Sequence, residues 1–275
     1  MKRLLLCFLL TSTFGLSASR EELIQNYQKI LEPFQKKSSI IGQGNPAITK
    51  HPMTTEQCLE KAKQANVTFE NPQFEKICGA PFMAPLYNPA KQKPEEAKVC
   101  IDQFEFPDIP CEYPVVWTQA NEAVEICSAA GKRICDAHEW EGACAGDLEA
   151  PDYAFDSFPN LPPEAQLKAR RAAHNAVANK NPVYSYGKER KKGICAMSST
   201  KADDCNGGDW KHCGSNTYPA GSFPECKSAL EVFDIHGNAA EHMNIPAKPE
   251  EMASANATSP LGYTEMKGSW FIFDK

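Results

Sequence analysis

Cysteine content is the feature that most limits how this chain can fold. The chain has 12 cysteines among its 275 residues, and all but Cys7 lie well beyond the N-terminal segment. These eleven are Cys58, Cys78, Cys100, Cys111, Cys127, Cys135, Cys144, Cys195, Cys205, Cys213 and Cys226. None of them has the Cys-x₂-Cys spacing of a zinc site, so we expect mostly disulfides rather than metal thiolates. Because eleven is odd, one thiol is free, pairs with another chain, or has lost a partner beyond Lys275.

The N-terminus has the pattern of a secretory signal peptide. Lys2 and Arg3 precede a short apolar run, and small residues follow at 17–19. The run is shorter than the roughly 20 residues of a membrane-spanning helix, and no later segment is apolar enough to span a bilayer. Residues 1–19 are therefore predicted to be a signal peptide. The mature protein is expected in the periplasm or outside the cell, where disulfides persist.

The charge of the chain excludes one class of partner. Loss of Lys2 and Arg3 with the signal peptide changes the formal net charge from -6 to -8, because residues 1–18 contain no acid. Nucleic-acid binding needs a basic surface, so an acidic exported chain is a poor candidate for it.

Periodicity divides the mature chain into two regions. Residues 20–98 contain a predicted amphipathic helix at 21–37, a second helix that begins near Thr54, and a Pro-rich run from Pro72 to Pro94. We interpret this region as a helical extension that docks on the main domain, and Cys58 is a possible partner of Cys78.

The main domain, residues 99–275, has an α+β pattern with little regular secondary structure. It contains two predicted strands and three predicted helices, followed by a disulfide-linked coil. The strands are Val99–Phe106 and Pro114–Trp117, the helices are Thr118–Ala130, Asp136–Gly146 and Pro162–Ala178, and the coil covers residues 180–226. Long coils of this kind carry sites more often than packed elements do.

The stretch from Val232 to Met243 is the best candidate site. Its Gly237-Asn238 pair is a turn signal, and it is flanked by two acids, Asp234 and Glu241. Carboxylates and backbone carbonyls around a tight turn are the oxygen ligands that Ca²⁺ prefers. The alternative is an ordinary turn with two solvated acids, and the residues alone leave both interpretations open.

Five motifs in order resemble the formylglycine-generating enzyme family, also called the sulfatase-modifying factor domain. They are Cys100–Glu105, Pro114–Ala120, Gly131–Glu141, Phe233–Glu241 and Lys267–Trp270. The resemblance covers residues 99–275 and implies an elaborated C-type-lectin-like fold. It also implies a structural calcium site made by the side chains of Asp234 and Glu241 and the carbonyls of Gly237 and Ala239. A second family calcium site would lie in the preceding loop, where oxygens are available from Asp203, Asp204, Asn206 and Asp209.

The catalytic residues of the family do not carry over. The resemblance places the first of two copper-binding cysteines at Ile272, and the second falls beyond Lys275. An alkyl side chain cannot replace a thiolate as a ligand for Cu(I). Ala240 and His242 stand where the family has tryptophan. Ser269 matches an active-site serine of the family, but without the cysteines it is interpreted as a polar turn residue.

Two functions follow from these observations. The first is a calcium-stabilised, non-catalytic binding module for a peptide, glycan or protein, with neither copper nor iron. The alternative is a metal-dependent oxidoreductase of the formylglycine-generating or non-heme-iron type, whose active-site tail lies beyond Lys275. An iron site would need ligands such as His212, His236 and His242, which have no spacing that places them on one helical face.

Overall fold

The computed structural model describes residues 18–38, 40–44, 51–180, 183–197, 215–255 and 263–268. Within these ranges the chain forms six α-helices, two 3₁₀-helices and six short strands. The helices are α1 (Arg20–Lys37), α2 (Thr55–Gln64), α3 (Pro72–Cys78), α4 (Ala120–Ala129), α5 (Ala137–Ala145) and α6 (Pro163–Ala178), with 3₁₀-helices η1 (Pro94–Glu96) and η2 (Pro249–Glu251). The strands are β1 (Gly42–Gln43), β2 (Met83–Leu86), β3 (Val99–Asp102), β4 (Val115–Val116), β5 (Glu241–Ile245) and β6 (Tyr263–Lys267). This mixture confirms the predicted α+β class.

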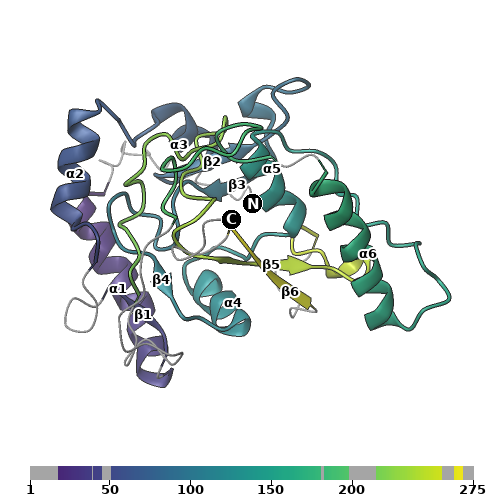
Figure 1. The fold of residues 1–275 in the computed structure, drawn as a ribbon. Coiled ribbons are helices and arrows are strands. Elements are labelled where there is room, and N and C mark those ends of the chain that lie inside the picture. Colours follow the sequence, from purple (N-terminus) through teal and green to yellow (C-terminus); the bar gives the residue numbers. More distant parts are fainter. Residues whose placement is uncertain are drawn as a thin grey trace, which may run out of the picture.

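The six strands form three antiparallel pairs, β1–β4, β2–β3 and β5–β6. In the central pair Met83 lies opposite Asp102, and α3 and α5 both contact β2. Figure 1 shows α1 and α2 at one side of the molecule and α6 at the opposite side. Because no pair extends into a larger sheet within the described ranges, irregular segments supply much of the packing.

Local capping signals account for the helices that were predicted correctly. At α2 the Thr54 hydroxyl accepts from the Gln57 N–H at 3.2 Å, and the Gln57 side chain accepts from the Thr54 N–H at 2.9 Å. This reciprocal pair satisfies two amides that have no partner inside the helix. Thr118 was predicted to cap the next helix, and this prediction is wrong by one residue, because Gln119 is the N-cap of α4, which begins at Ala120.

Helix α3 was missed in the segment predicted as a Pro-rich run. Asn71 accepts from the Phe74 N–H at 3.1 Å, Pro72 takes the first helical position, and Gly79 ends the helix at φ 76°. Proline is tolerated at the first position because the N–H it lacks has no helical partner there. An Asn-Pro start and a glycine stop were therefore present in the sequence as helix signals.

Aromatic rings fill the core between α2, the 103–106 segment and the candidate turn. The rings of Phe104 and Phe233 stack with centroids 4.9 Å apart, and Phe69 meets Phe104 edge-on at 5.3 Å. All three side chains are buried. Such pairs contribute about 1 kcal/mol each beyond the burial of their area. Phe233 thus fixes the chain one residue before Asp234.

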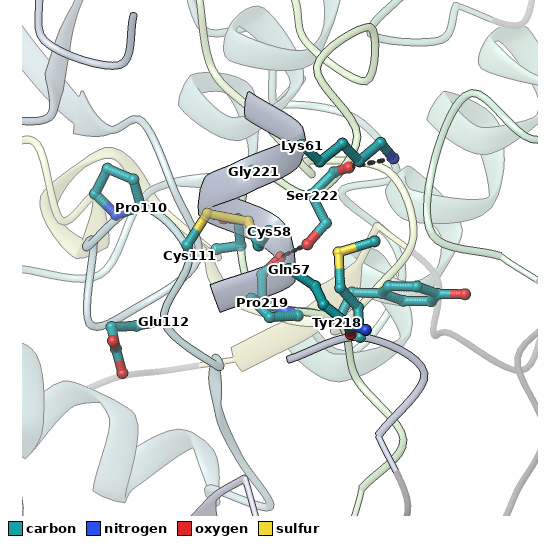
Figure 2. The surroundings of a disulfide bond; sticks show 12 residues. Gln57, Cys58, Lys61, Pro110, Cys111, Glu112, Tyr218, Pro219, Gly221 and Ser222 are labelled. Carbon is teal, nitrogen blue, oxygen red and sulfur yellow. Dashed lines mark hydrogen bonds between the residues drawn. A yellow bond between two sulfur atoms is a disulfide. The ribbon is translucent and has the colours of Figure 1, made fainter. Parts of the chain in front are cut away.

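Three disulfides cross-link the described residues, Cys58–Cys111, Cys78–Cys100 and Cys195–Cys226. The suggested Cys58–Cys78 pair is wrong. Figure 2 shows that Cys58, on α2, instead reaches Cys111 beside Gly221 and Ser222, and the Lys61 ammonium donates to the Ser222 carbonyl at 2.7 Å. Cys127, Cys135 and Cys144 are free thiols, while Cys205 and Cys213 lie outside the described residues.

Contacts cross the predicted domain boundary between residues 98 and 99. Strand β2 pairs with β3, and Cys78 is bonded to Cys100. On the other side of the molecule, β1 pairs with β4. The division into a helical extension, residues 20–98, and a main domain, residues 99–275, stays a prediction. Across the part of the chain that the structure describes, no helix is long and apolar enough to cross a membrane.

Candidate functional site

The candidate turn at Asp234–Glu241 depends on residues that tolerate a left-handed backbone. Gly237 has φ 96° and Asn238 has φ 55°. A Cβ on Gly237 would lie 2.6 Å from the Ala196 carbonyl oxygen, so this glycine is required by space as well as by conformation. The Asn238 N–H donates to the same oxygen at 2.9 Å, and the Gly237 N–H donates to the Gly268 carbonyl at 2.5 Å. Segments distant in sequence therefore hold the turn.

The Asn238 side chain ties the turn to two further segments. It is 1% exposed, its Oδ1 accepts from the Tyr218 N–H at 2.8 Å, and its Nδ2 donates to Tyr218 O at 3.0 Å and to Glu105 Oε2 at 2.6 Å. All of its hydrogen-bonding atoms are used, as expected for a buried amide that fixes a conformation. The residue does more than form the turn, which was the role predicted for it.

Glu105 is a site residue that the sequence analysis did not single out. The side chain is 4% exposed, and its Oε1 accepts from the Ala239 N–H at 2.6 Å. Burial raises the pKa of Glu105 well above its ordinary value, and the nearby charges of Asp234 and Glu241 raise it further. Its place in the first of the five motifs was the only signal available for it.

Asp234 and Glu241 are both brought to the site, but their environments differ. Asp234 is 2% exposed, accepts from the Gly221 N–H through Oδ2, and has a buried Oδ1 with no hydrogen-bond partner among the described residues. Glu241 is partly exposed and accepts from the Trp140 indole N–H. The simple-turn interpretation required both acids to be solvated. Asp234 is buried, so it does not meet this requirement.

The carboxylates are held where a negative charge is costly. Burial raises the pKa of Asp234 to about 7, against the lowering effect of the Gly221 N–H. Burial also raises the pKa of Glu241 to about 7; the Trp140 hydrogen bond lowers it, and the charge of Asp234 raises it. Burial raises the pKa of all three acids, and the charge of Asp234 raises the pKa values of Glu105 and Glu241 further, so the electrostatics of the site favour a cation or protons.

The oxygens around the turn fit a calcium ion better than a transition metal. Asp234 Oδ1 is unpartnered, and no hydrogen bond within the described ranges reaches the carbonyls of Gly237 and Ala239. No three His, Cys, Asp or Glu side chains converge as a metal cluster in that part of the chain. The predicted ligand set has only two carboxylates and otherwise uses carbonyls, which are hard oxygen donors. It supplies no nitrogen or sulfur ligand.

A groove of about 640 Å³ adjoins the turn. Its walls include Trp140, Ala240, Glu241 and His242. The two positions where the family resemblance implies tryptophan thus line the groove, and alanine and histidine leave more space there than tryptophan would. The volume lies within the range of small-molecule sites.

The two candidate histidines that the structure describes have different neighbours. The His242 ring contacts the Thr118 carbonyl at 2.9 Å, whereas the His236 ring meets Tyr184 edge-on at 5.2 Å. Burial lowers the pKa of His236. His212 lies outside the described residues. An iron site built from these three side chains therefore stays a prediction, of which the structure describes only His236 and His242.

Two free thiols, Cys127 and Cys135, also line the groove beside the turn. Burial raises the pKa of Cys127 to about 11 and that of Cys135 well above its ordinary value. Both are therefore protonated at neutral pH, whereas metal binding and nucleophilic attack need the thiolate.

Several predicted residues lie outside the described ranges: Asp203, Asp204, Asn206, Asp209, Ser269 and Ile272.

Paired short strands, disulfides and a buried acidic turn beside a groove define a cross-linked α+β domain with a candidate cation site. A sequence profile described as the sulfatase-modifying factor enzyme 1-like domain matches residues 45–273. The chain belongs to this family, which confirms the resemblance predicted from the motifs. The match begins well before residue 99, so it includes about two thirds of the predicted extension. No curated protein sequence matches the chain.

Proposed function

We propose that this chain is an exported, calcium-stabilised member of its family that binds a ligand in the groove beside the turn and does not catalyse cysteine oxidation. The observation that carries the proposal is Asp234, a buried carboxylate with one unpartnered oxygen next to Glu105 and Glu241. A buried charge without a partner costs several kcal/mol, and a bound cation would remove that cost. The proposal includes a C-type-lectin-like arrangement of the domain.

Asp234 and Glu241 would hold the ion through their side chains, and Gly237 and Ala239 through their carbonyls. The ion would supply structural charge compensation only. Glu105 would then act as a positioning residue, because its hydrogen bonds to Asn238 and Ala239 set the backbone from which the carbonyls project. Export is supported by the signal-peptide pattern and by three disulfides, which persist in oxidising compartments.

A binding role is favoured over oxidation by the sequence and by the thiols that line the groove. Ile272 stands at the position that corresponds to a catalytic cysteine, and the thiols of Cys127 and Cys135 are protonated at neutral pH. Stoichiometric Cu(I) binding, together with oxidation of a cysteine-containing peptide by the full chain, would instead support the oxidoreductase alternative.

Calcium is expected to raise the melting temperature of the protein. At a free concentration of about 100 Kd, an ion that binds only the folded state adds about 2.7 kcal/mol of stability. For a chain of this size that corresponds to a rise of about 5–10 °C. Thermal unfolding followed by circular dichroism, in calcium and in chelator at neutral pH, measures the difference.

Two substitutions separate a specific site from a general salt effect. Asp234→Asn keeps the shape of the side chain and an acceptor for Gly221, but it removes the charge, so the calcium-dependent rise should disappear. Asp156→Asn changes an exposed acid and should retain the full rise. Equal melting temperatures of the unmodified protein in calcium and in chelator would exclude the proposed site.

Without calcium, stability is expected to fall as pH rises from about 5 to about 8. The pKa values of Asp234 and Glu241 are raised to about 7 from ordinary values of 3.8 and 4.5. Between these values the folded state holds more protons than the unfolded state, so raising the pH favours unfolding. In excess calcium the trend should reverse at this site, because the ion binds the ionised carboxylates.

Urea unfolding across this pH range, in chelator and in calcium, measures both trends. The difference between the unmodified protein and Asp234→Asn isolates the contribution of this carboxylate from that of other titrating groups. If this difference did not depend on pH in chelator, the raised pKa of Asp234 would be refuted.

A further inference from the structure

A second groove, of about 610 Å³, lies between α5, α6 and the β5–β6 pair, and its wall contains a buried arginine. Arg170, on α6, is 7% exposed. Its Nη2 donates to the Ala247 carbonyl at 3.0 Å, its Nη1 reaches the Tyr153 carbonyl at 3.5 Å, and its Nε is buried without a hydrogen-bond partner. No carboxylate within the described ranges pairs with it. The ring of Phe155, 5.4 Å from the guanidinium carbon, is its other contact.

Other cations of this groove have acidic partners. Arg171 pairs with Glu265. The Lys267 ammonium lies 2.8 Å from the Glu141 carboxylate, and the His174 ring nitrogen lies 3.1 Å from it. Arg170 is thus a buried positive charge. Among the described residues, two carbonyl oxygens and the face of one aromatic ring compensate this charge, and no carboxylate does. Such a group is costly unless an anion joins it.

The groove wall is apolar next to Arg170. Leu167 lies one turn earlier on the same face of α6 and packs with Ala137, Met243 and Ile245. Phe158 and Val177 line the groove with exposed apolar side chains, at 43% and 66% exposure. An apolar surface next to a convergent charged group is typical of small-molecule sites. Charged side chains line the other parts of this groove.

The carbonyl that faces Arg170 is itself held in place. The Tyr153 hydroxyl accepts from the His138 N–H at 3.1 Å and lies 2.9 Å from Nδ1 of the same residue. The same hydroxyl therefore makes two contacts with His138. Helix α5 therefore fixes the loop that carries Tyr153 and, with it, one side of the guanidinium.

We propose that this groove binds a small monocarboxylic acid with an apolar body, its carboxylate paired with Arg170. The planar guanidinium offers parallel N–H donors that match a carboxylate. A phosphate dianion fits less well, because the wall contains more acidic than basic side chains, the acids being Glu141, Asp147, Glu149, Asp152 and Glu265. The site is separate from the acidic turn and does not depend on calcium.

Titration of the full chain with octanoate, and separately with octanamide, tests the proposal by NMR line shape or calorimetry. The two probes share an apolar chain and differ in charge. Octanoate is expected to bind at least about tenfold more tightly, because a hydrogen bond to a charged group contributes more than one to a neutral group. Equal binding of the two probes, or tighter binding of inorganic phosphate, would overturn the assignment. Binding should persist in chelator, which separates this result from the calcium proposal.

Variants on α6 locate the binding. Arg170→Met should reduce octanoate affinity to that of octanamide. Because Arg170→Met also removes two hydrogen bonds and can lower stability, Ala173→Phe provides a second test by filling the groove from an exposed wall position. Ala172→Phe, on the adjacent exposed residue outside the wall, is the matched control and should bind octanoate normally. Unchanged binding in Ala173→Phe would place octanoate elsewhere, and tighter binding of an acetylated tripeptide acid would overturn the small-ligand assignment.

Discussion

Replacing both Cys58 and Cys111 with alanine is expected to lower the free energy of unfolding by about 4 kcal/mol. The disulfide joins residues separated by 53 positions. Because it closes a large loop, it lowers the conformational entropy of the unfolded chain and so stabilises the folded state. Both sulfurs are buried, at 1% and 0% exposure, next to the aromatic cluster. The crosslink also holds α2 against the segment at Gly221 and Ser222 (Figure 2).

Urea unfolding at a fixed temperature measures this loss. Cys127→Ala is the control, because it removes a thiol of the same size that forms no crosslink among the described residues, and its effect should stay below about 1 kcal/mol. If the double variant and Cys127→Ala unfolded at the same urea concentration, the Cys58–Cys111 bond would have no measurable stabilising effect.

Asp136→Ala is expected to cost about 3–5 kcal/mol. The carboxylate is 0% exposed and accepts four hydrogen bonds: from Asn244 Nδ2 at 2.7 Å, Ala253 N at 2.8 Å, Ser254 N at 2.9 Å and Ser254 Oγ at 2.7 Å. Alanine would leave the buried donors of Asn244 and Ala253 without an acceptor, and each such group costs about 1–3 kcal/mol. Ser254 is exposed, so its two donors can turn to water.

Two further variants grade this effect. Ser254→Ala removes one of the four donors and should cost about 1 kcal/mol. Asp136→Asn keeps one oxygen for Asn244 and Ala253 but presents an amide to the Ser254 N–H, so its cost should fall between the other two. Chemical denaturation of all three variants gives the order, and an Asp136→Ala variant no less stable than Ser254→Ala would refute the role of the carboxylate.

Asp136 also shows the limit of sequence-based prediction of the fold. Its spacing to Glu139 predicted a helix start, and α5 does begin at Ala137, with the Asp136 N–H donating to Glu139 at 2.9 Å. The carboxylate, however, binds residues 244 to 254, more than a hundred positions away. Capping depends on neighbours in sequence and can be predicted, whereas a partner across the fold leaves no periodic signal.

The candidate site was predictable to the extent that it is contiguous. Asp234, Gly237, Ala239 and Glu241 lie within eight residues, so spacing and family resemblance could indicate them together. Glu105 shares the site but precedes Asn238 by 133 positions, and only the fold shows that it binds the turn. Arg170 lies in the predicted helix Pro162–Ala178 but was not singled out there. Its burial depends on the loops at Tyr153 and Ala247, which no local pattern predicts.

The supports of the acidic turn have a consequence for fragments of this protein. Gly237 and Asn238 donate to carbonyls at residues 268 and 196, and the Asn238 amide binds residues 105 and 218. An excised peptide of residues 232–243 would retain both proposed side-chain ligands and both carbonyls but none of these supports. Binding of calcium to such a peptide would also have to order its backbone, which costs conformational entropy. Calcium recognition at this turn would then be a property of the assembled domain, unlike that of a self-contained binding loop.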